Sequence, residues 1–247
     1  MVTPPLWFMN HQSFRVHHFQ PTSGNAWTHP EDLKSFINPK GEGRRGAYAP
    51  RVAMDDQGNA VIFWKQGVGN KNVIFKSERI DGQWRHPQSS DDAVTPTASI
   101  ATDINDLCMS SNGDVLLLWT DFQDRRHSLY LSQYREGKWS HPGADDALVA
   151  DPQQYQFVVF GSCAMADNAK VIAVWMERGD DAFTRLSFAE NDNGQWGTPG
   201  SQLNVEDKPA NSFVVSASAK GNFIISWVHS DGNDTKVYCS VYRTKKP

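Results

Sequence analysis

The stretch Gly58–Trp84 reads GNAVIFWKQGVGNKNVIFKSERIDGQW, and its pattern recurs along the chain. It holds an apolar run that ends at Trp64, a polar loop, a second apolar run and an Asp-Gly pair just before Trp84. The apolar run returns as GDVLLLW at 113–119, AKVIAVW at 169–175 and GNFIISW at 221–227. Repetition on this scale indicates a fold built from repeated supersecondary units.

The tryptophans set the period of the repeat. Those that end the four apolar runs are 55, 56 and 52 residues apart, and a second tryptophan follows the first three of them after 20, 20 and 21 residues. Trp7 and Trp27 are also 20 residues apart. We therefore predict a structural role, between neighbouring repeat units, for all nine: Trp7, Trp27, Trp64, Trp84, Trp119, Trp139, Trp175, Trp196 and Trp227.

Each repeat predicts four antiparallel strands. A short strand ends at Met54, and a polar turn with Gly58 follows it. The run to Trp64 is apolar at nearly every residue, which is typical of a strand buried on both faces. A third strand alternates in character, the Asp81-Gly82 pair predicts a hairpin turn, and the proline of Trp-x-x-Pro suits an edge strand.

Four antiparallel strands in about 50 residues form the blade of a β-propeller. We predict a single all-β domain over residues 1–247, a β-propeller of five blades with mostly four strands each. The units run over about 1–40, 41–95, 96–150, 151–205 and 206–247; the first lacks an inner strand and the last an outer one. A solenoid is the alternative architecture.

The Gly-Asn-x-apolar-apolar-apolar-Trp run, followed by Asp-Gly-x-Trp-x-x-Pro, resembles the blades of bacterial sialidase-like β-propellers. The sialidase Asp-box is Ser-x-Asp-x-Gly-x-x-Trp. Ser77 and Trp84 have that separation, but Arg79 and Asp81 stand where the box has Asp and Gly. The resemblance therefore implies the blade architecture and no catalytic residue. It favours a secreted or cell-surface location, although no signal peptide is visible.

Composition excludes several classes of function. Lys plus Arg is 24 and Asp plus Glu is 28, so the net charge of −4 argues against a nucleic-acid-binding face. No apolar run approaches the ~20 residues of a membrane span. No P-loop, zinc or serine-nucleophile motif is present, so we predict neither cofactor nor metal. The three cysteines, Cys108, Cys163 and Cys239, are odd in number and widely spaced, which is not a disulfide framework. Cys108 and Cys163 stand in apolar strand contexts, so we predict that they are unpaired, buried thiols.

Function is expected at the edge of the blades that carries the long, variable loops. These loops follow the second strand and the fourth strand of each repeat. They hold carboxylates, arginines and aromatic residues, the groups that bind sugars or peptides. The candidate ligand-binding residues are Arg44, Tyr48, Arg51, Asp121, Arg126, Tyr155, Glu177, Arg178 and His229.

Three hypotheses for function follow. The first is a non-catalytic module that binds a carbohydrate or protein ligand at this edge. The second is a glycoside hydrolase of the sialidase-like class, which needs two carboxylates that converge from different blades. The third is a structural or interaction fragment of a larger repeat protein. The sequence does not determine the oligomeric state.

Overall fold

The three-dimensional structure is a computed structural model. It describes residues 32, 35–39, 46–95, 102–123, 126–143, 146–148, 155–168, 170–179, 184–192, 194–197, 203, 209–230 and 234–243. The chain divides into two compact units, residues 1–36 and residues 37–247, and the fold below is that of the second. Most of the predicted first repeat unit, with Trp7 and Trp27, lies outside the described residues, as does Arg44.

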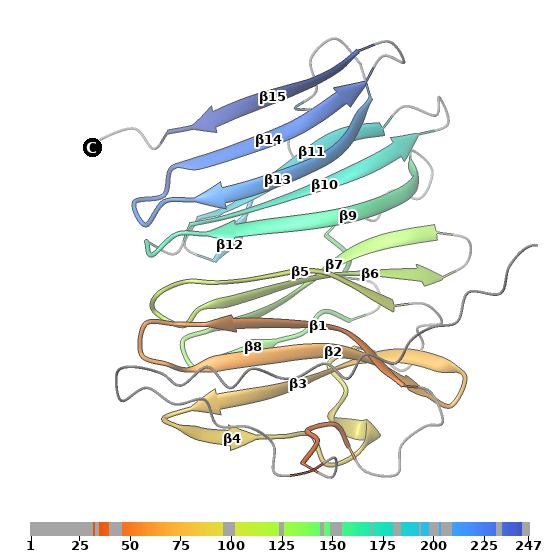
Figure 1. The fold of residues 1–247 in the computed structure, drawn as a ribbon, viewed down its shortest axis with the longest axis vertical. Coiled ribbons are helices and arrows are strands. Elements are labelled where there is room, and N and C mark those ends of the chain that lie inside the picture. Colours follow the sequence, from red (N-terminus) through yellow and green to blue (C-terminus); the bar gives the residue numbers. More distant parts are fainter. Residues whose placement is uncertain are drawn as a thin grey trace, which may run out of the picture. The chain divides into compact units, whose positions relative to one another are not determined.

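The second unit contains four antiparallel sheets, each with its strands in sequence order (Figure 1). Blade I comprises β1 (Ala47–Met54), β2 (Ala60–Val68), β3 (Lys71–Ile80) and β4 (Gln83–Arg85). Blade II comprises β5 (Thr102–Met109), β6 (Val115–Gln123), β7 (Arg126–Arg135) and β8 (Lys138–Ser140). Blade III comprises β9 (Tyr155–Met165), β10 (Val171–Gly179), β11 (Thr184–Asp192) and β12 (Gln195–Trp196). Blade IV comprises β13 (Ala210–Ala217), β14 (Phe223–Ser230) and β15 (Thr235–Tyr242).

The sheets confirm the all-β, β-propeller prediction. Three are four-stranded meanders, and the last has three strands among the described residues. The fifth blade was predicted over residues 1–40, so its structure lies outside the described part. The single-domain boundaries also stay a prediction. The one helix in the described ranges is the short 3-10 turn η1 (Ser90–Asp92), and no described helix has the length and apolarity that a membrane crossing requires.

The tight turns form for local reasons. Asp55 accepts hydrogen bonds from the backbone N–H groups of Gln57 and Asn59 at 2.9 and 2.8 Å, which closes the turn from β1 to β2. The turn from β3 to β4 has positive φ at both central residues, 50° at Asp81 and 78° at Gly82. This is the type I′ geometry that matches the twist of a hairpin.

The core lies between neighbouring blades. Trp119 packs among residues of blade I, Trp175 among residues of blade II and Trp227 among residues of blade III, so each faces the preceding blade. All three are at most 4% exposed. Trp84 differs, because it is 43% exposed and stacks on His86.

Cys108 of β5 and Cys163 of β9 form a disulfide, with their Cα atoms 6.0 Å apart. The prediction of unpaired thiols is therefore wrong for this pair. Wide spacing along the sequence is misleading in a repeat protein, because the first strands of neighbouring blades II and III lie in contact. Residues about one repeat apart meet there. Cys239 on β15 is free and exposed.

Candidate functional site

The first strand of every described blade carries a β-bulge or register irregularity. The register shifts at Tyr48/Arg51 in β1, at Ile104/Asp106 in β5 and at Ala210/Ser212 in β13. In β9 the shift falls between the partners of Trp175 and Met176, which leaves Phe160 unpaired. Bulges re-aim side chains and are frequent next to active sites. The same irregularity in four strands therefore marks a place where each blade turns a residue out of its ladder.

Two of the bulged residues are held in an unfavourable backbone conformation. Ala49 has φ of 50° and Phe160 has φ of 54°, a region that side chains other than glycine rarely adopt. Strain of this kind persists where the surrounding structure imposes it, and it is concentrated at functional sites. Phe160 is also 66% exposed despite its large apolar ring. Its conformation and its exposure both point to a role outside the core.

The bulged residues line one cavity of about 510 Å³, which we call the bulge pocket. Residues from β1, β5, β9 and β13 meet there although they are spread over more than 160 positions of the chain. The cavity lies toward the edge at which β1, β5 and β13 begin. Its lining is Ala49, Arg51, Asp103, Ile104, Asn105, Phe160, Gly161, Ser162, Met176, Asn211, Ser212 and Phe213.

A second cavity of about 330 Å³, the side pocket, shares Asp103, Asn105 and Phe160 with the bulge pocket. Between the blades the Lys65 ammonium lies 2.8 Å from the Asp103 carboxylate, an ion pair that joins β2 to β5. His127, stacked at a tilt on Phe122, also lines the side pocket. Burial lowers the pKa of His127, and the Asp121 carboxylate opposes this effect.

One partly buried carboxylate, that of Asp106, fixes the walls of the bulge pocket. Asp106 accepts hydrogen bonds from the Ser162 hydroxyl at 2.6 Å and from the Cys163 N–H at 3.0 Å. These bonds and the adjacent disulfide hold β5 against β9. Next to Asp106, the Oδ1 atom of Asn105 is buried and has no hydrogen-bond partner in the structure. An amide oxygen of this kind is available to accept from a ligand hydroxyl.

Of the predicted ligand-binding residues, Arg51 lines the bulge pocket. Tyr48 is exposed on the same strand but lines neither pocket, and Arg178 is exposed on β10. The side chains of Arg126 and Tyr155 lie outside the described residues. Contact of these residues with a ligand stays a prediction.

The remaining three predicted residues, Asp121, Glu177 and His229, are buried two positions after a tryptophan and line neither pocket. Glu177 accepts a hydrogen bond from the Ser187 hydroxyl. Burial raises its pKa, against the opposing effects of Ser187, Trp175 and Arg185. Nδ1 of His229 lies 3.0 Å from the Pro209 carbonyl oxygen. These carboxylates and this imidazole belong to the sheet interior.

The residues of the second strands that line the pockets are Lys65, Thr120, Phe122 and Met176. Thr120 and Phe122 flank Asp121, and Met176 precedes Glu177. Consecutive side chains of a strand point to opposite faces. A selection that is wrong by one residue therefore names a side chain on the opposite face from the pocket. The sequence-based selection also omitted Asn105, Phe160 and Asn211. Their signal is their position near the start of each first strand, but no sequence pattern marks the bulges.

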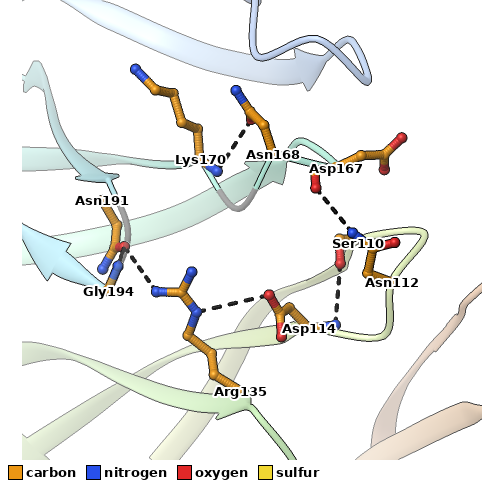
Figure 2. Close-up of polar contacts among 9 residues, drawn as sticks. All are labelled: Ser110, Asn112, Asp114, Arg135, Asp167, Asn168, Lys170, Asn191 and Gly194. Atoms are coloured by element: carbon orange, nitrogen blue, oxygen red, sulfur yellow. Dashed lines mark hydrogen bonds and ion pairs between the residues drawn. The ribbon is translucent and has the colours of Figure 1, made fainter.

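The opposite edge of the blades carries a polar network that is internally paired (Figure 2). Asp167 of blade III accepts from the Ser111 N–H at 3.2 Å, and its carbonyl accepts from the Asn112 amide at 3.0 Å. Figure 2 shows Arg135 between Asp114 and Asn191. The Arg135 guanidinium lies 3.8 Å from the Asp114 carboxylate and donates to the Asn191 amide oxygen at 3.5 Å. These contacts join the turns of blades II and III and have a structural role.

A third cavity, of about 380 Å³, lies at the same edge between blades I and II. Its polar groups are also engaged within the protein. The Trp139 N–H donates to Glu78, Asp55 closes the turn described above, and Arg79 donates to the Gly58 carbonyl at 2.6 Å. The bulge pocket differs because the buried Oδ1 atom of Asn105 has no hydrogen-bond partner among the described residues there. We therefore take the bulge pocket as the candidate site.

No family model matches this sequence, and no curated protein matches it. Solved structures with a similar fold do exist. A protein of unknown function from Dyadobacter fermentans superposes with a TM-score of 0.56 at 12% identity, over 83% of this chain and 68% of that one. The GH93 α-L-arabinofuranosidase of Fusarium graminearum, in complex with arabinobiose, gives 0.51 at 14% identity, over 84% and 65%. A PL25 ulvan lyase bound to -[GlcA(1-4)Rha3S]- gives 0.52 at 10% identity, over 78% and 51%.

At these identities the likeness shows the fold alone, and it agrees with the blade architecture. The chain spans about two thirds of the first two structures and about half of the third. Two of the three are carbohydrate-active enzymes. They support a propeller-like fold of the kind that sugar-active enzymes use, and they do not single out the sialidase-like class.

Proposed function

We propose that this chain binds a carbohydrate in the bulge pocket. The observation that carries the proposal is the convergence of four bulged first strands on one cavity, with Phe160 exposed at positive φ. Holding an aromatic ring exposed at positive φ lowers the stability of the fold. An exposed ring at the wall of a pocket can stack on the apolar face of a sugar.

The other lining groups suit the hydroxyls of a sugar ring. Asn105 and Asn211 present planar amides, Ser212 presents a hydroxyl, and Asp103 presents carboxylate oxygens. These groups donate and accept in fixed directions, so together they recognise a pattern of hydroxyl groups. Apolar lining with a few converging polar groups is the usual composition of a small-ligand site.

The structural comparisons add limited support. The arabinofuranosidase and the ulvan lyase act on carbohydrates by their names, but a shared fold does not carry a shared function. The proposal therefore depends on the pocket, and the names narrow the set of ligands to be tested first.

The first test compares oligosaccharide binding by the wild-type chain and by Phe160→Ala, using titration calorimetry against a panel of neutral and acidic oligosaccharides. Loss of the ring should weaken binding about tenfold, or ~1.4 kcal/mol, because the stacking contact disappears. Trp84→Ala is the matched control, since Trp84 is an exposed aromatic that lines neither pocket. Equal affinity in wild type and Phe160→Ala, or no binding to any oligosaccharide, would refute the proposal.

Glycoside hydrolysis is the second candidate, and Asp103 is the observation in its favour. Its carboxylate lines the pocket, where a catalytic base or nucleophile has to lie, and it forms an ion pair with Lys65. A glycosidase needs a second carboxylate, and among the described lining residues Asp103 is the only one in either pocket. Turnover of arabino-oligosaccharides or aryl glycosides that is lost in Asp103→Asn would establish this alternative. The hypothesis of a structural fragment stays a prediction.

A further inference from the structure

The charged side chains of the two pockets indicate the charge of the carbohydrate ligand. We infer that the carbohydrate bound in the bulge pocket is anionic, with its acidic group held by Arg51. This inference rests on the proposed function above and deepens it.

Arg51 is a pocket cation without an acidic partner in the described structure. Its guanidinium donates one hydrogen bond, at 3.2 Å, to the carbonyl of the adjacent Pro50. No described carboxylate forms an ion pair with it. Most of its five N–H donors therefore remain for a ligand. A guanidinium is permanently charged and pairs with a carboxylate or sulfate through two parallel hydrogen bonds.

The carboxylate of Asp103 does not balance the positive charge of Arg51, because it forms an ion pair with Lys65. Asp103 is the only acidic side chain among the described residues that line the two pockets, and Lys65 pairs with it at 2.8 Å. The lining thus carries two cations and one anion, while His127 is held toward its neutral form by burial. An excess positive charge in a concave site attracts anions, and it stands out in a chain whose net charge is −4.

The other lining groups are neutral and match the rest of an acidic sugar. Asn105, Asn211 and Ser212 can bind hydroxyls, and Phe160 can contact the ring. A neutral sugar would leave the Arg51 guanidinium to be desolvated without a counter-charge, which is unfavourable. A sugar with a carboxylate or a sulfate replaces water at Arg51 with a charge-assisted pair.

The test uses oligogalacturonate and its fully methyl-esterified form, which differ in charge but share the sugar backbone. Wild-type protein should bind the acid at least tenfold more tightly than the ester. Raising the salt concentration from about 20 to 200 mM should weaken the binding of the acid and leave the binding of the ester unchanged. Arg51→Gln should abolish this preference. Arg51→Lys should retain part of it, because lysine keeps the charge but not the paired geometry.

Arg85→Gln is the matched control, since Arg85 is exposed on the outer strand β4 and lines neither pocket. A second experiment compares the binding of dextran sulfate with that of dextran. A preference for the sulfated polymer that depends on Arg51 supports an anionic ligand whose negative charge comes from sulfate. Neutral oligosaccharides that bind as tightly as acidic ones, with no effect of Arg51→Gln, overturn the inference and leave the proposed function intact. Absence of binding to every probe overturns both.

Discussion

At the residue scale, neighbouring side chains of one strand point to opposite faces of the sheet. Met176 lines the bulge pocket, whereas Glu177 lines neither pocket and accepts a hydrogen bond from Ser187, although both residues are only 5% exposed. They lie one and two positions after Trp175, and alternation along the strand separates them. Glu177 is consequently an internal carboxylate with a measurable effect on stability.

Glu177→Gln should stabilise the chain at pH 7 by about 1 kcal/mol, a size typical of removing a poorly compensated buried charge. Burial raises the pKa of Glu177, so its native state favours the protonated form. Its stabilising effect is present below the ordinary pKa of a glutamate and is lost as the pH rises through the raised value. Urea unfolding at pH 7 and pH 4 should show the difference shrinking at pH 4. Glu136→Gln, at an exposed turn, should show neither effect, and a less stable Glu177→Gln at pH 7 would contradict this interpretation.

At the scale of the element, each blade is a meander whose turns repeat while its first strand is interrupted. The turns at Asp81-Gly82 and Glu136-Gly137 share positive φ at both residues. The interruptions bring side chains of β1, β5, β9 and β13 to one cavity. Regular hairpins thus fix the spacing of the strands, and the bulges create the site.

Gly82→Ala should destabilise the chain by roughly 1 kcal/mol. The added Cβ meets only the end of the Arg79 side chain at 3.8 Å, so the cost comes from φ of +78°, which alanine adopts unfavourably. Thermal unfolding of Gly82→Ala measures this loss of stability. Gly46→Ala is the control, because Gly46 has room for a Cβ and lies outside the positive-φ region. Equal melting temperatures for the two variants would show that the turn conformation contributes nothing.

At the scale of the whole molecule, the blades are held by apolar seams, by polar turn contacts and by one covalent bond. Trp119, Trp175 and Trp227 fill successive seams. The disulfide joins blades II and III beside the Asp106 contacts that shape the bulge pocket. Stability and site geometry therefore share the same junction.

Cys108→Ser should lower the free energy of unfolding by about 2–4 kcal/mol, because the disulfide closes a long loop of the unfolded chain. Denaturant unfolding under non-reducing conditions measures this loss, and a reducing agent should bring the wild type close to the variant. Cys239→Ser is the control, since this thiol is exposed and free. A wild type that is insensitive to reduction would argue against the bond.

The repeated blade can be predicted from the amino-acid sequence alone, because hydrophobic period, turn residues and tryptophan spacing are local properties present in each unit. The same reasoning placed Arg51 among the ligand-binding candidates. The pairing of Cys108 with Cys163, the burial of Glu177 and the exposure of Phe160 became evident only in three dimensions. These facts depend on register, on bulges and on which blades adjoin. A shift of one residue in a strand reverses the direction of its side chains, and composition and spacing do not record that shift.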